Sequence, residues 1–235
     1  MAGATGTQLT AVGLGLIVVA AGQSARFGRD KLWAPLGGQP VLAHSLTALG
    51  APPVERLALV VAPARLHDAH ALVAALPIPA VVVPGGPRRQ DSVRNGLEAL
   101  GPCEWIAVHD AARPFATRDL LLRTWAVAQA VGAAVPAVPV NDTIKRVREG
   151  LVVETLPRAE LWAVQTPQVF RGALLWEAHR AVGEDVTDDA ALVERCGARV
   201  GVAQGAYDNI KITTPDDLEL AGWLLARRTE ARVRG

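Results

Sequence analysis

Cysteines are few in this sequence, and long apolar runs are absent. Its two cysteines, Cys103 and Cys196, are far apart and form no C-x-x-C pair. This spacing argues against a disulfide framework or a zinc site and is typical of free thiols in a reducing compartment. Glycine and proline interrupt the apolar stretches well before they reach the length of a membrane span. We therefore expect a soluble protein of the cytoplasm.

An excess of either charge is also missing. The 235 residues include 24 Lys and Arg and 23 Asp and Glu, which gives a net charge of +1. Apart from the Arg-rich end at 227–234, no block of like charge stands out, so binding of duplex nucleic acid is not expected. Residues 1–12 lack the basic start and apolar run of a signal peptide. We expect them to be a leader, followed by one domain over 13–235.

Several motifs that would indicate a known chemistry are absent. No G-x-G-x-x-G follows a predicted strand and no G-K-[ST] occurs, so neither a dinucleotide fingerprint nor a Walker loop is indicated. A G-x-S-x-G elbow is missing, which gives acyl transfer little support. The histidines do not cluster with cysteines or acids at the spacing of zinc ligands.

The most informative stretch present runs from 14 to 33. An apolar run, Leu14–Ala20, ends at Gly22 in a small polar loop that carries Arg26 and Lys31. Such a run indicates a buried parallel strand that delivers a loop to the edge of the sheet where ligands bind. Free backbone N–H groups and fixed cations suit a polyphosphate. The alternative is an ordinary turn with solvated cations.

Strands and helices alternate through the first two thirds of the chain, which predicts a parallel sheet with helices on both faces. The expected strands are 14–20, 56–62, 80–84, 105–108 and 133–138, and the expected helices are 40–49, 63–76, 88–100 and 117–131.

The alternation stops near residue 140. Apolar and polar side chains alternate over 143–147 and 151–155, with a turn at 148–150, which predicts a hairpin arm at about 140–160. A two-stranded hairpin is marginally stable alone, so we expect it to pack on a partner subunit. The remaining chain is expected to form helices at 172–182, 188–196 and 218–228 and strands at 199–203 and 208–212.

Small or charged residues follow three of the predicted strands: the loop from Gly22 to Lys31, the pair Gly85-Gly86 with Ser92, and Asp110 with Arg113. The carboxyl ends of strands in a doubly wound sheet meet at one edge. We therefore expect these residues to converge on one site.

These residues belong to a series of motifs. In order they are V-A-A-G-Q-S-A-R-F-G-x-D-K, G-G-x-x-R-x-D-S-V, V-H-D-A-A-R-P, D-T-I-K, L-W-A-V-Q-T-P-Q, T-D-D-A and D-N-I-K-I-T-T-P-D-D-L, and they span Val19 to Leu218. The series closely resembles the 2-C-methyl-D-erythritol 4-phosphate cytidylyltransferase family of the nucleotidyltransferase superfamily. The resemblance implies a Rossmann-like α/β fold, a homodimer joined through the hairpin arm, and Mg²⁺ or another divalent cation as cofactor.

The resemblance also implies the reaction. The family transfers CMP from CTP to methylerythritol phosphate and releases pyrophosphate, in the pathway to isoprenoid precursors. Such a transfer needs positioning and charge neutralisation more than a covalent nucleophile. Ribitol-5-phosphate cytidylyltransferase shares most of the motifs and is the alternative enzyme. A nucleotide-binding regulator without turnover is a further alternative, which the retained cations argue against.

The resemblance assigns roles to particular positions. The catalytic cations are Arg26, Lys31, Arg158 and Lys211. The nucleotide would be bound by Ala20, Ala21, Gly22, Gly85, Gly86, Ser92 and Ala111, and the acceptor by Asp110, Arg113, Thr143, Thr166 and Thr187. Asp110 could instead bind the metal, since one carboxylate does not decide between the two roles. For each cation the alternative is an ordinary surface charge, and for Gly85-Gly86 it is a turn that ends a strand.

Overall fold

The computed structural model describes residues 12–22, 27, 30–183 and 186–234. The strands are β1 (Val12–Ala20), β2 (Pro35–Leu36), β3 (Gln39–Pro40), β4 (Arg56–Val61), β5 (Ala80–Pro84), β6 (Cys103–Asp110), β7 (Ala133–Pro139), β8 (Lys145–Arg148), β9 (Leu151–Thr155), β10 (Trp162–Val164), β11 (Gln168–Arg171) and β12 (Gly201–Gln204). The helices are α1 (Val41–Leu49), α2 (Leu66–Ala74), α3 (Arg89–Leu100), α4 (Arg118–Val131), α5 (Gly172–Ala181), α6 (Asp189–Arg195) and α7 (Pro215–Arg234). Short 3₁₀ turns occur at η1 (Pro63–Arg65) and η2 (Arg158–Glu160). Within this part of the chain no helix is long and apolar enough to cross a membrane.

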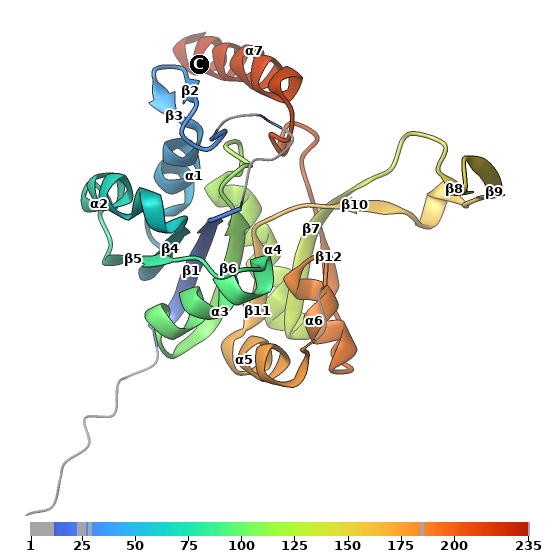
Figure 1. The fold of residues 1–235 in the computed structure, drawn as a ribbon, viewed down its shortest axis with the longest axis horizontal. Helices are drawn as coiled ribbons and strands as arrows, with labels where there is room; N and C mark the ends of the chain where they lie inside the picture. The colour runs from blue at the N-terminus through green and yellow to red at the C-terminus, as the bar shows by residue number, and fades with distance from the viewer. Residues whose placement is uncertain (1–11, 23–26, 28–29, 184–185, 235) are drawn as a thin grey trace, which may run out of the picture.

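An eight-stranded sheet forms the centre of the molecule (Figure 1). Strand β1 lies between β4 and β6 and is parallel to both, and β5 continues the parallel part beyond β4. Strand β7 is paired with β10 and β11, both antiparallel, and with β12, which is parallel. Strand β11 also pairs antiparallel with β6. The expected α/β fold with a mostly parallel sheet is confirmed.

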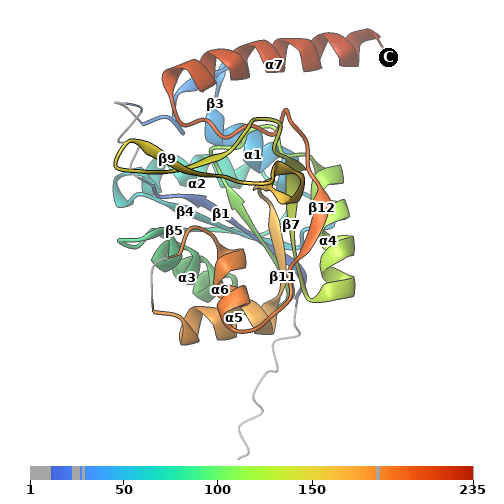
Figure 2. The same cartoon turned by 90° about the vertical axis from the view of Figure 1, so that its right-hand side faces the viewer.

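Helices cover both faces of the sheet, as the alternation of side chains along β1 requires. Leu14, Leu16 and Val18 pack in one apolar cluster with α1, α2, α4 and α7, whereas Ile17 packs in a second cluster with α3, α5 and α6. Successive side chains of a strand point to opposite faces, so an all-apolar strand needs a cover on each side. Figure 2 shows α3, α5 and α6 together on one side of the sheet.

A two-stranded arm projects from the sheet (Figure 1). Strand β7 leads into it, β8 and β9 pair antiparallel with an irregularity between Arg146 and Val147, and β10 returns along β7. Every residue of β8 and β9 is exposed. The expected hairpin is therefore present, at 145–155 within the predicted 140–160.

The largest differences from expectation lie in the second half of the chain. The predicted strand at 208–212 is wrong: this segment is irregular, and the Ile212 N–H donates to Ala112 O over 2.8 Å. It thus joins a loop at the end of β6 and not a sheet edge. Strands β10 and β11 were not predicted, since they are only three and four residues long. In the first half of the chain, the predicted helix at 63–76 begins as η1 and continues as α2.

Candidate active site

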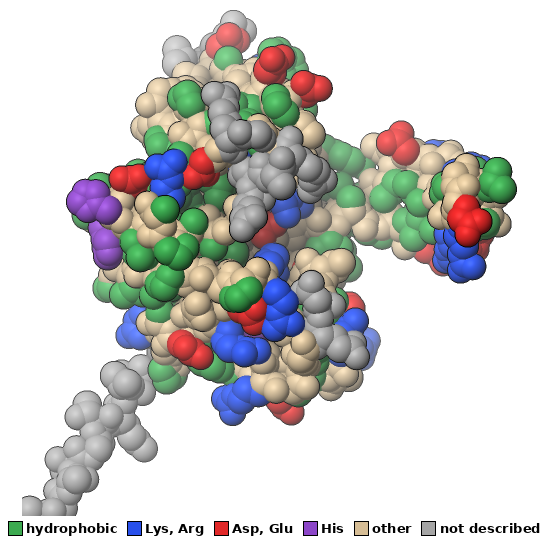
Figure 3. All heavy atoms as spheres, in the orientation of Figure 1, with side chains coloured by type: hydrophobic (Ala, Val, Ile, Leu, Met, Phe, Trp, Pro, Cys, Tyr) green, Lys and Arg blue, Asp and Glu red, His purple; other side chains and the backbone are tan. Residues whose placement is uncertain are grey.

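A cavity of about 660 Å³ lies at the carboxyl ends of β1, β5 and β6. The convergence expected from sequence is therefore present. Figure 3 shows several Lys and Arg side chains in the middle of this face of the molecule. Of the residues assigned from sequence, the cavity is lined by Ala21, Gly22, Lys31, Gly85, Gly86, Ser92, Asp110 and Lys211.

Two glycines after β5 let the backbone come close to its neighbours. A Cβ on Gly85 would collide with the Cβ of Ala21, and one on Gly86 would collide with Asp91. The Gly86 N–H donates to Ser92 Oγ over 3.1 Å, and that hydroxyl donates to Arg88 O over 3.1 Å. These hydrogen bonds fix the turn. Because its glycines have no side chains, the backbone of the turn itself lines the cavity.

The Asp110 carboxylate lies between two cations. Lys211 Nζ donates to its Oδ2 over 2.7 Å, and the Nε and Nη2 groups of Arg89 both donate to its Oδ1 over 3.3 Å. Its side chain is 14% exposed. Burial alone would raise the pKa of Asp110, but the charges of Arg89 and Lys211 outweigh burial and hold this pKa far below its ordinary value. Asp110 is therefore an anion that fixes the positions of both cations.

Arg89 has a second carboxylate partner that the sequence argument did not assign. Its Nη1 donates to Asp189 Oδ2 over 2.7 Å, and Asp189 Oδ1 lies 3.3 Å from His179 Nε2. Both Asp189 and His179 are buried. Arg89 and Asp189 stand inside the quoted motifs G-G-x-x-R-x-D-S-V and T-D-D-A. Both residues therefore lay within recognised motifs, but their spacing in the sequence could not predict that side chains 100 positions apart form an ion pair.

A smaller cavity of about 250 Å³ adjoins the first, and Arg89, Asp110 and Lys211 line both. It is also lined by three residues expected to contact the acceptor, namely Arg113, Thr166 and Thr187. Arg113 Nη1 donates to Asn209 O over 2.8 Å, and its Nη2 donates to Val164 O over 3.3 Å. The segment 208–212 therefore holds Arg113 in place.

Thr166 is fixed by the end of β6. The Asp110 N–H donates to Thr166 Oγ1 over 3.0 Å, and the same hydroxyl lies 2.9 Å from His109 Nδ1. His109 Nε2 lies 3.2 Å from Arg113 O, which only accepts, so the proton belongs on Nε2 and Thr166 donates to Nδ1. Complete burial lowers the pKa of His109 to about 4, so the ring is neutral at pH 7 and suits this network.

Other assigned residues lie elsewhere. Arg26 lies outside the described residues. Ala20 and Ala111 are buried and line neither cavity, and the Ala111 N–H donates to Val19 O over 3.0 Å. Thr143 and Arg158 are exposed at the arm, and neither lines the larger or the smaller of these two cavities. Arg158 Nη1 donates to Asn141 O over 2.5 Å.

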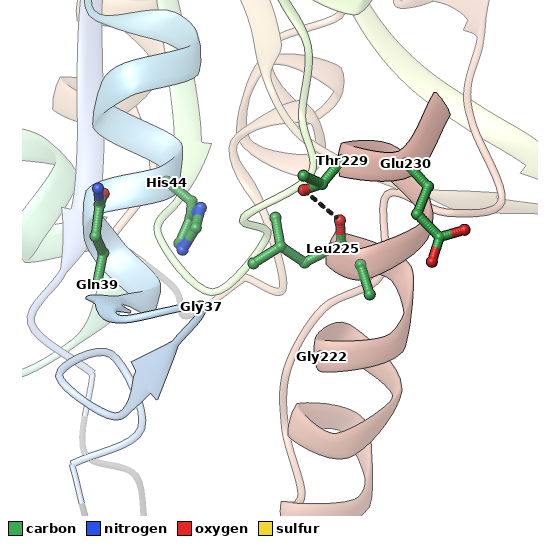
Figure 4. Close-up of a pocket in the computed structure, with 8 residues that line it drawn as sticks. Gly37, Gln39, His44, Gly222, Leu225, Thr229 and Glu230 are labelled. Atoms are coloured by element: carbon green, nitrogen blue, oxygen red, sulfur yellow. Dashed lines mark hydrogen bonds between the residues drawn. The ribbon is translucent and has the colours of Figure 1, made fainter. Parts of the chain in front are cut away.

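A cavity of comparable size, about 700 Å³, lies between the β2–β3 turn, α1 and α7 (Figure 4). Leu225 and Thr229 face it from α7, and His44 and Gln39 face it from the opposite side. Among its described lining residues there is no Lys or Arg, and the one carboxylate is Glu230. Because it lacks cations, it does not suit a phosphorylated ligand.

A site for a divalent cation is only partly built by the described residues. No group of three or more His, Cys, Asp or Glu side chains in them is placed to hold a metal ion. Asp110 is the one carboxylate among the described residues that line the larger cavity. Mg²⁺ is commonly held by one or two carboxylates together with substrate phosphates, so Asp110 fits that mode of binding.

A mostly parallel sheet that gathers glycine-rich turns and cations at one edge, with a second small polar pocket alongside, defines an α/β nucleotidyltransferase. The sequence profile of 2-C-methyl-D-erythritol 4-phosphate cytidylyltransferase matches residues 14–227. The chain belongs to this family and is a cytidylyltransferase.

Individual relatives agree with this assignment. The protein named 2-C-methyl-D-erythritol 4-phosphate cytidylyltransferase of Dehalococcoides mccartyi is 47% identical over 219 residues, which cover 91% of this chain and 96% of the relative. The crystal structure of 4-diphosphocytidyl-2C-methyl-D-erythritol synthase from Anaerococcus prevotii has a TM-score of 0.82 at 29% identity and covers 91% of this chain and 98% of that one. The Thermus thermophilus cytidylyltransferase structure has a TM-score of 0.73 at 34% identity and covers 89% and 98%.

Proposed function

We propose that the two adjoining cavities are the sites where this cytidylyltransferase joins the CMP of CTP to 2-C-methyl-D-erythritol 4-phosphate and releases pyrophosphate. The observation that carries the proposal is that Arg89, Asp110 and Lys211 line both cavities. An acceptor phosphate in the smaller cavity would therefore lie next to a triphosphate in the larger one. The product is 4-diphosphocytidyl-2-C-methyl-D-erythritol.

CTP takes the larger cavity. We assign the base and ribose to the part of the cavity beside Gly85-Gly86, because backbone groups of that turn line it and can recognise the edge of a pyrimidine. Ser92 is held beside it by the Gly86 N–H. The backbone at Ala21 and Gly22 approaches the phosphates from β1.

The chemical step is attack of an acceptor phosphate oxygen on the α-phosphorus of CTP, which breaks the bond to pyrophosphate. Lys31 and Lys211 line the cavity in which the triphosphate would lie, and they stabilise the negative charge that develops there. We assign the same role to Arg26, which follows β1 in the sequence and lies outside the described residues. No side-chain nucleophile is needed, because the acceptor supplies the attacking oxygen.

The acceptor takes the smaller cavity, where Arg113 and Thr166 are held by the hydrogen bonds described above. Thr187 completes this wall. Thr143 and Arg158 belong to the arm segment and line neither of these two cavities in their own chain. We assign them to the acceptor site of a second subunit, because arginine suits a phosphate dianion.

Asp110 would hold Mg²⁺ together with the triphosphate, because it is the one carboxylate among the described residues that line the larger cavity. The ion supplies charge neutralisation at the phosphates. Asp110 also keeps Lys211 and Arg89 in place, and their cationic groups would share the phosphate charge with the ion.

A homodimer joined through the arm is the active form. The arm and the adjoining strand β10 expose six large apolar side chains, between 42% and 72% accessible: Val147, Leu151, Val152 and Val153 on the arm, and Trp162 and Val164 on β10. Exposed apolar side chains gathered on one projecting element mark a protein–protein contact. We expect the enzyme to work in the cytoplasm.

The deciding experiment measures pyrophosphate release with CTP and each of two acceptors, methylerythritol phosphate and ribitol phosphate, in the presence of Mg²⁺. We expect turnover with methylerythritol phosphate and little with ribitol phosphate. Preference for ribitol phosphate would overturn the acceptor assignment. CTP binding without turnover of either acceptor would indicate a nucleotide-binding regulator.

A further inference from the structure

A row of side chains of alternating charge, from Lys211 to Asp189, runs from the cavities into the interior and ends on the His179 ring. Lys211 contacts Asp110, Asp110 contacts Arg89, Arg89 contacts Asp189, and Asp189 contacts His179. The first three residues line the cavities, whereas Asp189 and His179 line neither. The row thus joins the reaction site to groups that a substrate does not touch.

Asp189 is the buried carboxylate of this row. Its side chain is fully buried, and the 27%-exposed Arg89 is its cationic partner. Burial alone would raise the pKa of Asp189, but the Arg89 charge and the His179 contact lower it below its ordinary value. An ionised carboxylate without solvent needs such partners, so Asp189 and Arg89 constrain each other.

Arg89 divides its donors between two carboxylates. One terminal nitrogen contacts Asp189 over 2.7 Å, while Nε and the other terminal nitrogen share Asp110 Oδ1 at 3.3 Å. The shorter contact is to the buried partner, and the guanidinium is rigid and planar. Asp189 therefore sets how far Arg89 can approach Asp110.

We propose that Asp189 is a positioning residue: by holding Arg89 it fixes the Asp110 carboxylate at the junction of the two cavities, where the acceptor must be aligned. This inference rests on the proposed function. Without the Asp189 charge, Arg89 is free to close on Asp110 and to pull it from Lys211. The reacting phosphates would then lose alignment, and errors of this kind cost a large factor in rate.

A purely structural role is the competing explanation, since the ion pair also ties α3 to α6. The two explanations differ in what a substitution changes. A structural role lowers thermal stability and the amount of active enzyme, and leaves the KM of both substrates unchanged. A positioning role lowers kcat or raises the KM for the acceptor, and leaves the KM for CTP largely unchanged.

The test is a double-mutant cycle of Asp189→Asn and Arg89→Gln in the full-length enzyme, with kcat and KM measured for each substrate. We expect Asp189→Asn to lower kcat/KM for the acceptor by about ten- to hundredfold and to leave the KM for CTP within about twofold. We expect the double variant to be no worse than Arg89→Gln, because Asp189 acts through Arg89. Arg94→Gln is the matched control: it lies one turn further along α3 and donates to His179 O, yet lines neither cavity.

If Asp189→Asn does not fold, Arg89→Lys is the variant that tests the inference. Lysine keeps the charge but does not reach two carboxylates with a planar fork, so we expect the same selective loss for the acceptor. Additive losses in the cycle, wild-type kinetics in Asp189→Asn or Arg89→Lys, or a KM for CTP that rises as much as the KM for the acceptor would overturn the inference. Wild-type enzyme is assayed in parallel. If it does not turn over methylerythritol phosphate, the proposed function is wrong, whatever the variants show.

Discussion

Lys211 and Asp110 are 101 positions apart in the chain, and their side chains meet at 2.7 Å where the two cavities join. Asp110 ends β6, and Lys211 lies on the irregular segment before α7. That segment is held by the bond from the Ile212 N–H to Ala112 O and by the bond from Arg113 to Asn209 O. A loop bound to the end of a strand thus places a cation beside the carboxylate.

Replacement of Lys31 by alanine tests the proposed charge stabilisation. We expect kcat to fall about a hundredfold or more, on the order of 3 kcal/mol of lost stabilisation. Steady-state pyrophosphate release measures this. Arg123→Ala on α4 is the control, because it removes a cation that lines neither cavity. Near-normal turnover in Lys31→Ala would show that the assigned role is wrong.

Arg158 tests whether the arm serves the site of a second subunit. Arg158→Ala should raise the KM for the acceptor and leave the KM for CTP largely unchanged, because the residue lies away from the larger cavity. Mixing Lys31→Ala subunits with Arg158→Ala subunits should restore part of the activity at low acceptor concentration, since one site of the mixed dimer is intact. No recovery in verified heterodimers would contradict shared sites.

The apolar surface of the arm should hold the dimer together. Leu151 is 72% exposed in the single chain. We expect Leu151→Asp to shift the protein toward a monomer, because a carboxylate in an apolar contact loses its hydration. Analytical ultracentrifugation measures the shift. Trp223→Glu is the control: Trp223 is 55% exposed on α7, away from the arm, and its substitution should leave the dimer intact.

Gly85 should tolerate no side chain. A Cβ there would collide with Ala21 and come within 3.0 Å of Ser92 Oγ, so Gly85→Ala must push the ends of β1 and β5 apart. We expect a raised KM for CTP, accompanied by a lower melting temperature. The control is Gly222→Ala on α7, where nothing lies within 4 Å of the added carbon. Unchanged CTP binding in Gly85→Ala would remove this turn from the nucleotide site.

Asp217 should give α7 a pH-dependent stability. Its Oδ2 accepts from the N–H groups of Thr213 and Thr214, both over 2.8 Å, and the Asp217 N–H donates to Thr214 Oγ1. These hydrogen bonds outweigh the effect of burial and lower its pKa to about 2. A lowered pKa stabilises the fold above the unfolded value of about 3.9, and this contribution is lost as pH falls toward 2.

Asp217→Asn should therefore cost about 1 kcal/mol of unfolding free energy at pH 7, as loss of a helix cap does. The difference from wild type should shrink as the pH falls below about 4. Thermal unfolding at several pH values measures it, with Asp216→Asn as the neighbouring control. A difference that stays constant with pH would exclude ionisation of Asp217 as the cause.

Local sequence signals were enough to predict the strand–helix alternation from β1 to β7, the hairpin arm, and the arrival of Gly22, Gly85 and Asp110 at one edge of the sheet. These follow from local signals, because apolar runs, turn residues and alternation act over a few neighbouring positions. The order of the motifs likewise indicated the cytidylyltransferase family. The short strands β10 and β11 escaped prediction, since three or four residues hold too little periodicity to be recognised.

Which charged side chains from distant parts of the sequence form ion pairs became known only from the tertiary structure. The pairing of Arg89 with both Asp110 and Asp189, and of Lys211 with Asp110, depends on how α3, α6 and the segment before α7 pack around β6. The same packing made 208–212 a loop bound to Ala112 and not a strand. Contacts across 100 residues arise from the burial of helices on a shared sheet, and no local pattern encodes them.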